Sequence, residues 1–413
     1  MPANQDTWPR AIALIDMNAF FASVEQRDFP SLLGQPVAVT NGTRGSCVIT
    51  CSYEARARGV HTGMYLKQAR QLCPQLVQRP ARPVVYARVS TRIMRAIQDI
   101  CPDVEVFSVD EAFIDITPCQ RLYGSPIAIA HLLRDAVYQA SGLLCSVGLS
   151  GDKTTAKYAA KLNKPNGFTV ILPWEAKERL RDVPVTELCG IARGIGNFLA
   201  NYGVTRCGDM EKLPISVLAK RFGNLGRRIW YMCQGADPDP LHPDVAAPKS
   251  IGHGKVMPPN TKNREVILTY AQHMSYKVGG RMRKHQLEAR SYWIGLRTEF
   301  GWLGEKTRLA LFSHDPRKIF QLCREVIQRH WQGEGVWQIQ VTALDPQPVA
   351  MQLDMFADTP AEQQMQARLH AAMDDINNRY GAFTLSPARL LQRSDMPDVI
   401  APAWKPDGLR QTI

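Results

Sequence analysis

The most constraining feature of this sequence is a set of three carboxylates placed at the ends of apolar, strand-like segments. The apolar run 11–15 predicts a strand that ends at Asp16. Residues 104–116 predict two strands joined by a tight hairpin that carries Asp110 and Glu111. Strand ends within one sheet can bring such side chains together, and carboxylate oxygens are the ligands that Mg²⁺ prefers. Such a cluster could hold two Mg²⁺ ions, and a pair of ions about 3.5–4 Å apart can activate an attacking oxygen and stabilise a leaving oxygen.

An isolated Asp-Glu turn is usually a solvated surface feature, so the surrounding segments matter. Residues 1–173 alternate short apolar strands with amphipathic helices, which indicates an α/β fold. The strands that we expect are 11–15, 37–40, 46–50, 104–107, 112–116 and 145–149. The helices that we expect are 20–27, 52–59, 84–100, 125–139 and 154–162.

The remainder of the chain divides by composition. Residues 173–234 read as helical, and the Pro- and Asp-rich stretch 237–243 reads as an interdomain linker. Residues 248–346 contain 16 Lys and Arg against 8 Asp and Glu, and they mix β-like runs with helices. We expect a small basic α+β domain there. It carries most of the chain's net charge of +12, which indicates an acidic partner such as nucleic acid.

Several classes of protein are excluded by composition. The ten cysteines form no CxxC pair and follow no zinc-like spacing, so we expect small buried thiols in a reducing compartment. The first ten residues are polar, unlike a secretory signal. No stretch approaches the roughly 18 apolar residues of a membrane-spanning helix. We expect a multidomain protein of the cytoplasm with no membrane partner.

Four sequence motifs, in the order found here, resemble those of the Y-family translesion DNA polymerases. Two resemble the family's metal-binding motifs and read IDMNAFFASVE (15–25) and FSVDEAFID (107–115). The third, SCVITCSYEARARGV (46–60), resembles the fingers motif. The fourth is VGLS (147–150), followed by Lys153, Lys157 and KPNG (164–167). The resemblance covers about residues 1–350 and is tightest over 11–170.

The resemblance implies roles for residues around the carboxylates. Asp16, Asp110 and Glu111 would be catalytic ligands of two Mg²⁺ ions, with the main-chain carbonyl of Met17 as a further ligand. Glu111 would lie nearest the primer 3′-hydroxyl that attacks the α-phosphate. Asn18 stands where relatives often have Asp, but that position is not one of the essential ligands.

The same motifs imply a nucleotide-binding set. Phe21 would be the steric gate that blocks the ribose 2′-hydroxyl, whereas Phe20 would pack in the core. The residues implied to grip the dNTP triphosphate are Thr50, Tyr53, Arg56 and Lys164, which suit phosphate oxygens by charge or hydroxyl donation. Lys157 is a further candidate to face phosphates or DNA. Asp152 departs from the family pattern and could cap the following helix.

The implied architecture is a right-hand polymerase of α/β and α+β domains. Its parts would be a palm (1–22 and 83–173), fingers (23–82), a helical thumb with a helix-hairpin-helix (174–238), a linker (239–247), an α+β little finger (248–346) and a C-terminal tail (347–413). The thumb hairpin reads Gly-Ile-Ala from Gly190, with Gly194-Ile195-Gly196 just downstream. Its position is therefore open by about four residues.

The tail contains a peptide, QLDMF (352–356), that resembles the motif with which bacterial polymerases bind the sliding clamp. The residues implied to bind the clamp are Gln352, Leu353, Met355 and Phe356. Residues 373–381 resemble a C-terminal extension of UmuC-type members. The polymerase core does not decide between DinB-type and UmuC-type, so the need for a UmuD-like partner stays open.

The resemblance implies a template-directed DNA polymerase that acts on primer-template DNA and dNTPs with low fidelity, in damage bypass within DNA repair and the SOS response. One alternative is a non-catalytic, clamp- and DNA-binding relative, although such proteins lose acidic residues that are present here. Another is a different palm-type nucleotidyl enzyme, such as a cyclase. That alternative leaves the fingers motif, the thumb hairpin and the basic domain unexplained. The lesion, the fidelity and the regulation are not encoded in any motif.

Overall fold

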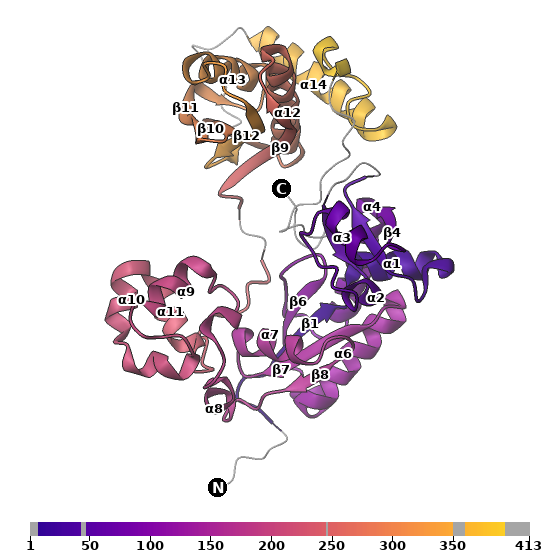
Figure 1. Ribbon diagram of the computed structural model, residues 1–413, viewed down its shortest axis with the longest axis vertical. Coiled ribbons are helices and arrows are strands. Elements are labelled where there is room, and N and C mark those ends of the chain that lie inside the picture. The colour runs from indigo at the N-terminus through magenta and orange to yellow at the C-terminus, as the bar shows by residue number, and fades with distance from the viewer. Residues whose placement is uncertain (1–6, 43–46, 245–246, 350–359, 393–413) are drawn as a thin grey trace. The chain divides into compact units, whose positions relative to one another are not determined.

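The parts of the chain that the computed structural model describes are residues 7–42, 47–244, 247–349 and 360–392. They form two compact units, unit 1 up to residue 244 and unit 2 from residue 247 (Figure 1). The expected clamp peptide 352–356 lies outside the described residues. Within the described residues, no helix combines the length and the apolarity that a bilayer span requires.

The centre of unit 1 is a five-stranded sheet with the order β5-β6-β1-β7-β8. Its strands are β1 (Ile12–Met17), β5 (Val104–Val106), β6 (Glu111–Asp115), β7 (Cys145–Ser150) and β8 (Phe168–Val170). Strand β1 is antiparallel to both β6 and β7, and β7 is parallel to β8. All six residues of β1 are buried, which explains why its sequence is an unbroken apolar run before Asp16.

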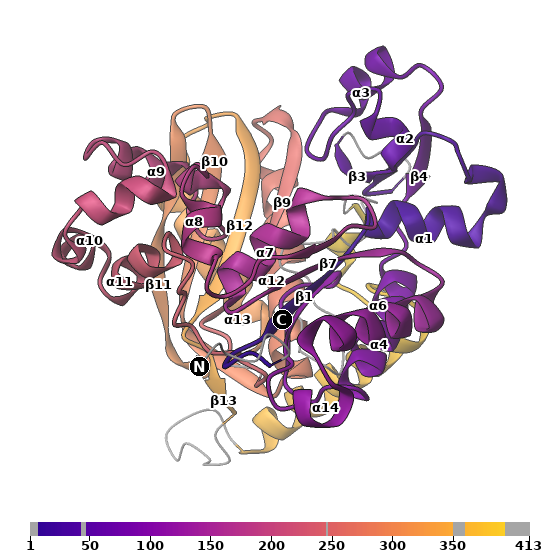
Figure 2. The same cartoon turned by 90° about the horizontal axis from the view of Figure 1, so that it is seen from below.

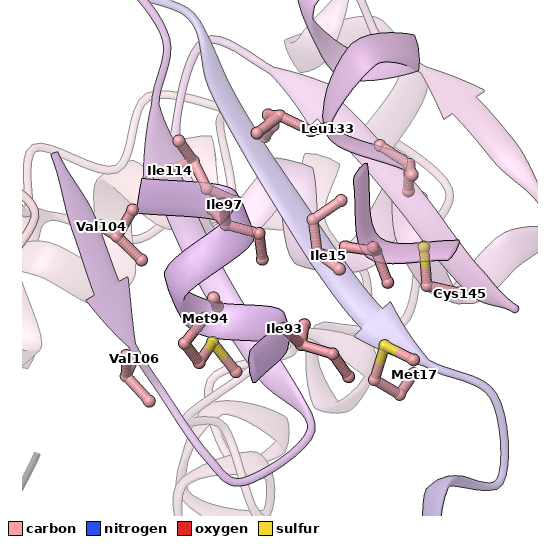
Figure 3. Close-up of a cluster of buried hydrophobic side chains, with 14 of the residues drawn as sticks. Ile15, Met17, Ile93, Met94, Ile97, Val104, Val106, Ile114, Leu133 and Cys145 are labelled. Carbon is pink, nitrogen blue, oxygen red and sulfur yellow. The ribbon is translucent and has the colours of Figure 1, made fainter. Parts of the chain in front are cut away.

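Helices cover both faces of this sheet (Figure 2). One face packs against α4 (Pro83–Gln98) and α6 (Pro126–Ser141). Figure 3 shows Ile15 and Met17 of β1 in this layer, with Ile93 and Ile97 of α4 and Leu133 of α6.

The other face of the sheet packs against α7 (Lys153–Leu162), through Ile12 and Leu14. Because side chains alternate along a strand, Asp16 shares the α7 face with Ile12 and Leu14. Gly148 on β7 lets α7 approach closely, since a Cβ atom there would overlap the backbone of Ala156.

A smaller sheet, with the order β3-β2-β4, forms a separate part of unit 1 with its own apolar core. Its strands are β2 (Val37–Thr40), β3 (Val48–Cys51) and β4 (Val77–Pro80), and the helices and turns around it are α1 (Phe20–Asp28), η1 (Pro30–Leu32), α2 (Tyr53–Arg56) and α3 (Leu66–Leu72). A short helix, α5 (Gln120–Tyr123), precedes α6. The helix expected over 52–59 is shorter, because the chain after Arg56 turns into Gly59, which has a φ of +83°.

The region 173–234, predicted to be helical, consists of short helices joined by turns. The elements are α8 (Ala176–Leu180), η2 (Val185–Glu187), α9 (Arg193–Ala200), η3 (Cys207–Lys212), α10 (Ile215–Phe222) and α11 (Asn224–Met232). They enclose a core of their own. Gly190, with a φ of +93°, forms the turn before α9, whereas Gly194 and Gly196 lie inside α9. The turn is therefore at the upstream of the two positions that the sequence left open.

Unit 2 is an α+β domain. Its four-stranded sheet has the order β11-β10-β12-β9, with β9 (Ser250–Thr261), β10 (Leu287–Thr298), β11 (Gly301–Ser313) and β12 (Val336–Leu344). A short strand, β13 (Gln347–Pro348), pairs with β10. Helices α12 (Arg264–Lys284) and α13 (Pro316–His330) pack against one face of the sheet around a shared apolar core. The expected small α+β domain is present.

Part of the expected tail belongs to unit 2. Helix α14 (Pro360–Tyr380) and turn η4 (Ala388–Gln392) are within it. The Arg283 guanidinium of α12 pairs with both Asp374 oxygens of α14, at 2.7 and 2.8 Å. Leu390 of η4 is fully buried. Residues 360–392 therefore differ from the separate tail that the sequence suggested, because a partly buried ion pair and an apolar anchor hold α14 and η4 in unit 2.

Candidate active site

The three predicted carboxylates lie together at one edge of the unit 1 sheet. Asp16 near the end of β1 is directly opposite Glu111 at the start of β6. Asp110 precedes Glu111, and its main-chain carbonyl accepts a hydrogen bond from the Met17 N–H at 2.9 Å. The Ser108 hydroxyl donates to the Asp110 carboxylate at 2.6 Å. Antiparallel pairing of β1 with β6 therefore brings these residues together, although they are far apart in the sequence.

Two lysines face the carboxylates. The Lys164 ammonium lies 2.5 Å from Asp16 Oδ2, and the Lys157 ammonium lies 2.5 Å from Glu111 Oε1. Burial and then the Glu111 charge raise the pKa of Asp16 to about 7. Burial also raises the pKa of Asp110 above its ordinary value. Burial opposes ionisation of Glu111 as well, but Lys157 holds the pKa of that carboxyl below its ordinary value.

The donor set suits hard divalent cations. Among the described residues, no three Asp, Glu, His or Cys side chains surround a single point as metal ligands. Asp16 and Glu111 pair with Lys164 and Lys157. Burial is the largest cause of the raised pKa values of Asp16 and Asp110, and the Glu111 charge adds to it, so the lysines only partly offset the cost of keeping these carboxylates charged. Oxygen donors with this excess negative charge fit Mg²⁺, which would remove the repulsion between them.

A pocket of about 270 Å³ connects the carboxylates to the expected nucleotide-binding residues. The predicted site residues that line it are Asp16, Met17, Phe21, Thr50, Tyr53, Arg56, Asp110 and Lys164. Glu111 does not line the pocket, but it is the cross-strand neighbour of Asp16. The structure thus places the described candidates for metal and nucleotide binding in one location, contributed by both sheets of unit 1.

The wall of the pocket formed by α2 and β3 suits an anionic ligand. The Tyr53 hydroxyl is buried and has no hydrogen-bond partner within the described residues. The Arg56 guanidinium lies 4.8 Å from the centre of the Tyr53 ring, and its Nε donates to the Cys51 carbonyl at 3.2 Å. A buried hydroxyl without a partner is costly, so a ligand oxygen at this place would satisfy it.

Phe21 forms another part of the pocket and is 8% exposed. Its ring stacks on that of Tyr86, whose hydroxyl donates to Glu25 at 2.8 Å. The buried Glu25 carboxylate also pairs with Arg79 at 3.2 Å and Arg82 at 2.6 Å. The sequence motifs did not predict roles for Tyr86 or Glu25. The position of Glu25 on the buried face of α1, one turn after Phe21, was the sequence feature that could have indicated this contact.

Three further motif residues have defined contacts. Asp152 caps α7, because its carboxylate accepts the Thr155 N–H at 2.9 Å, which confirms the expected capping role. The Asn18 side-chain oxygen accepts a hydrogen bond from Ser146 at 2.9 Å. Lys157 pairs with Glu111 and lies over the Phe107 ring, 4.4 Å from its centre. Its position beside Glu111 adds a contact that the motif alone did not indicate.

Comparisons with known proteins agree with this geometry. Residues 15–161 match the model of the impB/mucB/samB family, and residues 248–355 match the model of that family's C-terminal domain. A DNA polymerase IV from Moorella thermoacetica is 36% identical, over 90% of this chain and 94% of that protein. A DNA polymerase IV from Pelotomaculum thermopropionicum is 33% identical, over 92% of this chain and 97% of that protein.

The fold agrees as well. A solved Y-family DNA polymerase chimera superposes with a TM-score of 0.71 and 26% identity, over 81% of this chain and 98% of that chain. The predicted multidomain fold class is thereby confirmed. The two family models together match most of the chain, and the relatives match nearly its whole length. This chain therefore belongs to the impB/mucB/samB family and is a bacterial, DinB-like member of the Y-family DNA polymerases.

Proposed function

We propose that this chain is a catalytically active, template-directed DNA polymerase for translesion synthesis, and that Asp16, Asp110 and Glu111 are its catalytic carboxylates. The observation that carries the proposal is the single pocket that joins two of these carboxylates to Phe21, Arg56 and Lys164. Three crowded carboxylates repel one another, and a non-catalytic relative would have no reason to keep this unfavourable arrangement.

The carboxylates and the Met17 carbonyl would hold two Mg²⁺ ions. When bound, such ions activate the attacking oxygen and stabilise the leaving oxygen of a phosphoryl transfer. The chain's own contribution is positioning. Pairing of β1 with β6 fixes Asp16 against Glu111, and Ser108 orients Asp110. Lys157 keeps Glu111 ionised, which leaves that carboxylate able to bind a cation.

Binding of the incoming dNTP is assigned to the residues that line the pocket beside the carboxylates. Arg56 and Lys164 supply positive charge for the triphosphate, and the hydroxyls of Thr50 and Tyr53 supply hydrogen bonds. The buried Tyr53 hydroxyl without a partner supports this assignment. Phe21 would lie against the sugar, where its ring excludes a 2′-hydroxyl by contact.

Primer-template DNA would be held by the remaining parts. We assign the palm to 1–22 and 83–173, the fingers to 23–82, the thumb to 174–238, the linker to 239–247 and the little finger to 248–346. Of the tail expected over 347–413, α14 and η4 belong to the same unit as the little finger. The thumb turn at Gly190 would present backbone N–H groups to phosphates. Affinity should fall steeply with salt, because the little finger is basic.

The little-finger sheet has a face that α12 and α13 do not cover. Arg297 and Trp302 are cross-strand neighbours there, with the guanidinium 5.9 Å from the ring centre. Trp293 pairs with Lys306 on the same face. Gly252 lies on this face as well, and the Thr342 and Gln340 side chains occupy the space that its Cβ atom would take. Such a surface of cations, indoles and small polar groups supports backbone contacts with DNA.

The sliding clamp is the proposed partner of Gln352, Leu353, Met355 and Phe356. The position of this peptide immediately after the little finger supports the proposal. The relatives named DNA polymerase IV favour a DinB-type protein. They do not bear on a UmuD-like partner, which stays an open prediction, as does location in the cytoplasm.

Primer extension tests the proposed activity. Wild-type protein with Mg²⁺ and dNTPs should extend primers on undamaged templates and should also pass a template lesion. Extension in neither case, over a range of Mg²⁺ concentrations and with the clamp present, would favour the non-catalytic alternative.

A further inference from the structure

The segment that the sequence suggested as a linker begins with an aspartate bound to both palm and thumb. The Asp237 side chain is 0% exposed. It accepts two hydrogen bonds of 2.8 Å from the Arg228 guanidinium of thumb helix α11. It also accepts one of 2.6 Å from the Thr154 hydroxyl of palm helix α7. One buried carboxylate therefore joins a thumb helix to a palm helix.

Neighbouring charges extend this joint. The Lys153 ammonium of α7 lies 2.6 Å from Glu105 of β5 and 2.8 Å from Asp239. The Arg10 guanidinium donates to the main-chain carbonyls of Asp237 at 2.9 Å and Asp239 at 2.6 Å. We call the whole set the joint cluster; its members are Arg10, Glu105, Lys153, Arg228, Asp237 and Asp239.

Apolar packing across the same joint is incomplete. A cavity of about 380 Å³ lies between Phe107 and Phe113 of the palm and Leu225 and Ile229 of the thumb. It is larger than the pocket beside the carboxylates and contains none of the predicted catalytic residues. The thumb core is also distinct from the core between the palm sheet, α4 and α6, although Tyr158 of α7 packs against it. Because apolar contact is reduced at the cavity, the joint cluster supplies directional contacts there that packing does not.

The joint cluster is attached to the elements that hold a catalytic carboxylate. Lys153 lies one turn before Lys157 on α7, and the Lys157 ammonium pairs with Glu111. Glu105 is on β5, the strand paired with the β6 strand that begins at Glu111. The thumb is therefore fixed to the same helix and hairpin that position Glu111.

We propose that Asp237 is a positioning residue for DNA. By holding Arg228 against α7, it sets the placement of the thumb relative to the carboxylates, and so the place where a bound duplex puts its primer 3′ end. This inference rests on the proposed polymerase function. A neutral Asp237→Asn side chain of the same shape would lose the charge-assisted, two-point contact with Arg228 and leave that guanidinium only Asp239, 3.2 Å away, so Asp237 should be sensitive even to this replacement.

The test compares full-length Asp237→Asn with wild type. We expect the Kd for primer-template DNA to rise about tenfold, and the number of nucleotides added in each binding event to fall. The KM for dNTP at saturating DNA should stay within about twofold, because the nucleotide pocket is not part of the joint. A matched control is Asp182→Asn, which neutralises an exposed thumb carboxylate that pairs with Arg206 and should leave the DNA Kd unchanged.

A second variant guards against misfolding. Arg228→Met/Asp237→Asn removes both charges, so neither is left buried alone, and it should bind DNA as weakly as the single variant. The inference is overturned if folded Asp237→Asn and the double variant bind DNA with wild-type Kd and processivity and differ only in melting temperature. Failure of wild type to extend any primer would instead overturn the polymerase function itself, which separates the two results.

Discussion

The Phe21 and Tyr86 rings stack with their centroids 4.4 Å apart and their planes 16° from parallel. Tyr86 is fully buried, and its hydroxyl is held by Glu25. Phe21 therefore lies between the fixed Tyr86 ring and the pocket. A ring supported from behind cannot move away from a sugar substituent, which is what exclusion of a 2′-hydroxyl requires.

Replacing Phe21 with Ala should admit ribonucleotides. Loss of the ring opens space beside the sugar, and we expect the ratio of rNTP to dNTP incorporation to rise by about tenfold or more. Single-nucleotide insertion with each substrate measures this ratio. Phe21→Tyr keeps the ring and should retain the wild-type ratio. Equal, negligible rNTP insertion by wild type and Phe21→Ala would contradict the steric role.

Replacing Lys164 with Met should weaken dNTP binding. The ammonium is lost from the pocket wall, and a lost charge-assisted contact of about 1.5–3 kcal/mol corresponds to a rise in KM of about tenfold or more. Steady-state kinetics on saturating DNA give the KM and kcat. Lys161→Met is the matched control, because Lys161 is exposed and pairs with Glu187. A dNTP KM that is unchanged in Lys164→Met would exclude a triphosphate contact.

Unit 2 should lose stability in mild acid. Burial and then the Arg283 charge hold the pKa of His370 below its ordinary value of 6.5, and the same two causes act on His314. The unfolded chain therefore binds more protons, so stability is present above the ordinary pKa and falls as the pH decreases through it. The carboxylate of Asp315, 3.7 Å from His370, does not titrate in this range, because its pKa lies below the ordinary value.

Thermal melts of the full chain at pH 7.5 and 5.5 test this expectation. The melting temperature of the transition that includes α14 should fall in acid for wild type and fall less for His370→Gln. His61→Gln, at an exposed position of unit 1, should behave as wild type does. A fall in melting temperature between pH 7.5 and 5.5 that is equal in all three proteins would show that His370 is not its cause.

Deleting residues 352–356 should reduce clamp-stimulated synthesis to the unstimulated rate, while synthesis without the clamp stays unchanged. The physical reason is that the apolar side chains of this peptide would supply the anchors in the clamp. A milder variant, Met355→Ala/Phe356→Ala, should have a similar effect, whereas Asp354→Ala should have little. Stimulation that survives the deletion would refute a clamp-binding role.

Much of the fold could be predicted from the sequence, because β1 contains an unbroken apolar run and turn residues mark the hairpin between β5 and β6. The sequence indicated that Asp16 and Glu111 could meet at strand ends, whereas the pairing of β1 with β6 that places them opposite each other is seen only in the fold. Contacts between distant polar groups could not be predicted in this way. Tyr86 lies on another helix from Phe21, and Asp237 stands in a Pro-rich stretch that resembles a linker. Only the folded chain shows that Arg228 neutralises Asp237.

Single-turnover primer extension by Asp110→Asn is the most direct measurement of whether the three carboxylates form a catalytic centre. Asn keeps the shape of the side chain but removes its charge, so the loss should be on the order of 10³-fold, since an interaction with a catalytic cation is worth several kcal/mol. Asp115→Asn, at the far end of the β6 strand that Asp110 precedes, is the matched control and should react as wild type does. A rate for Asp110→Asn within about twofold of wild type would contradict the assignment of the active site.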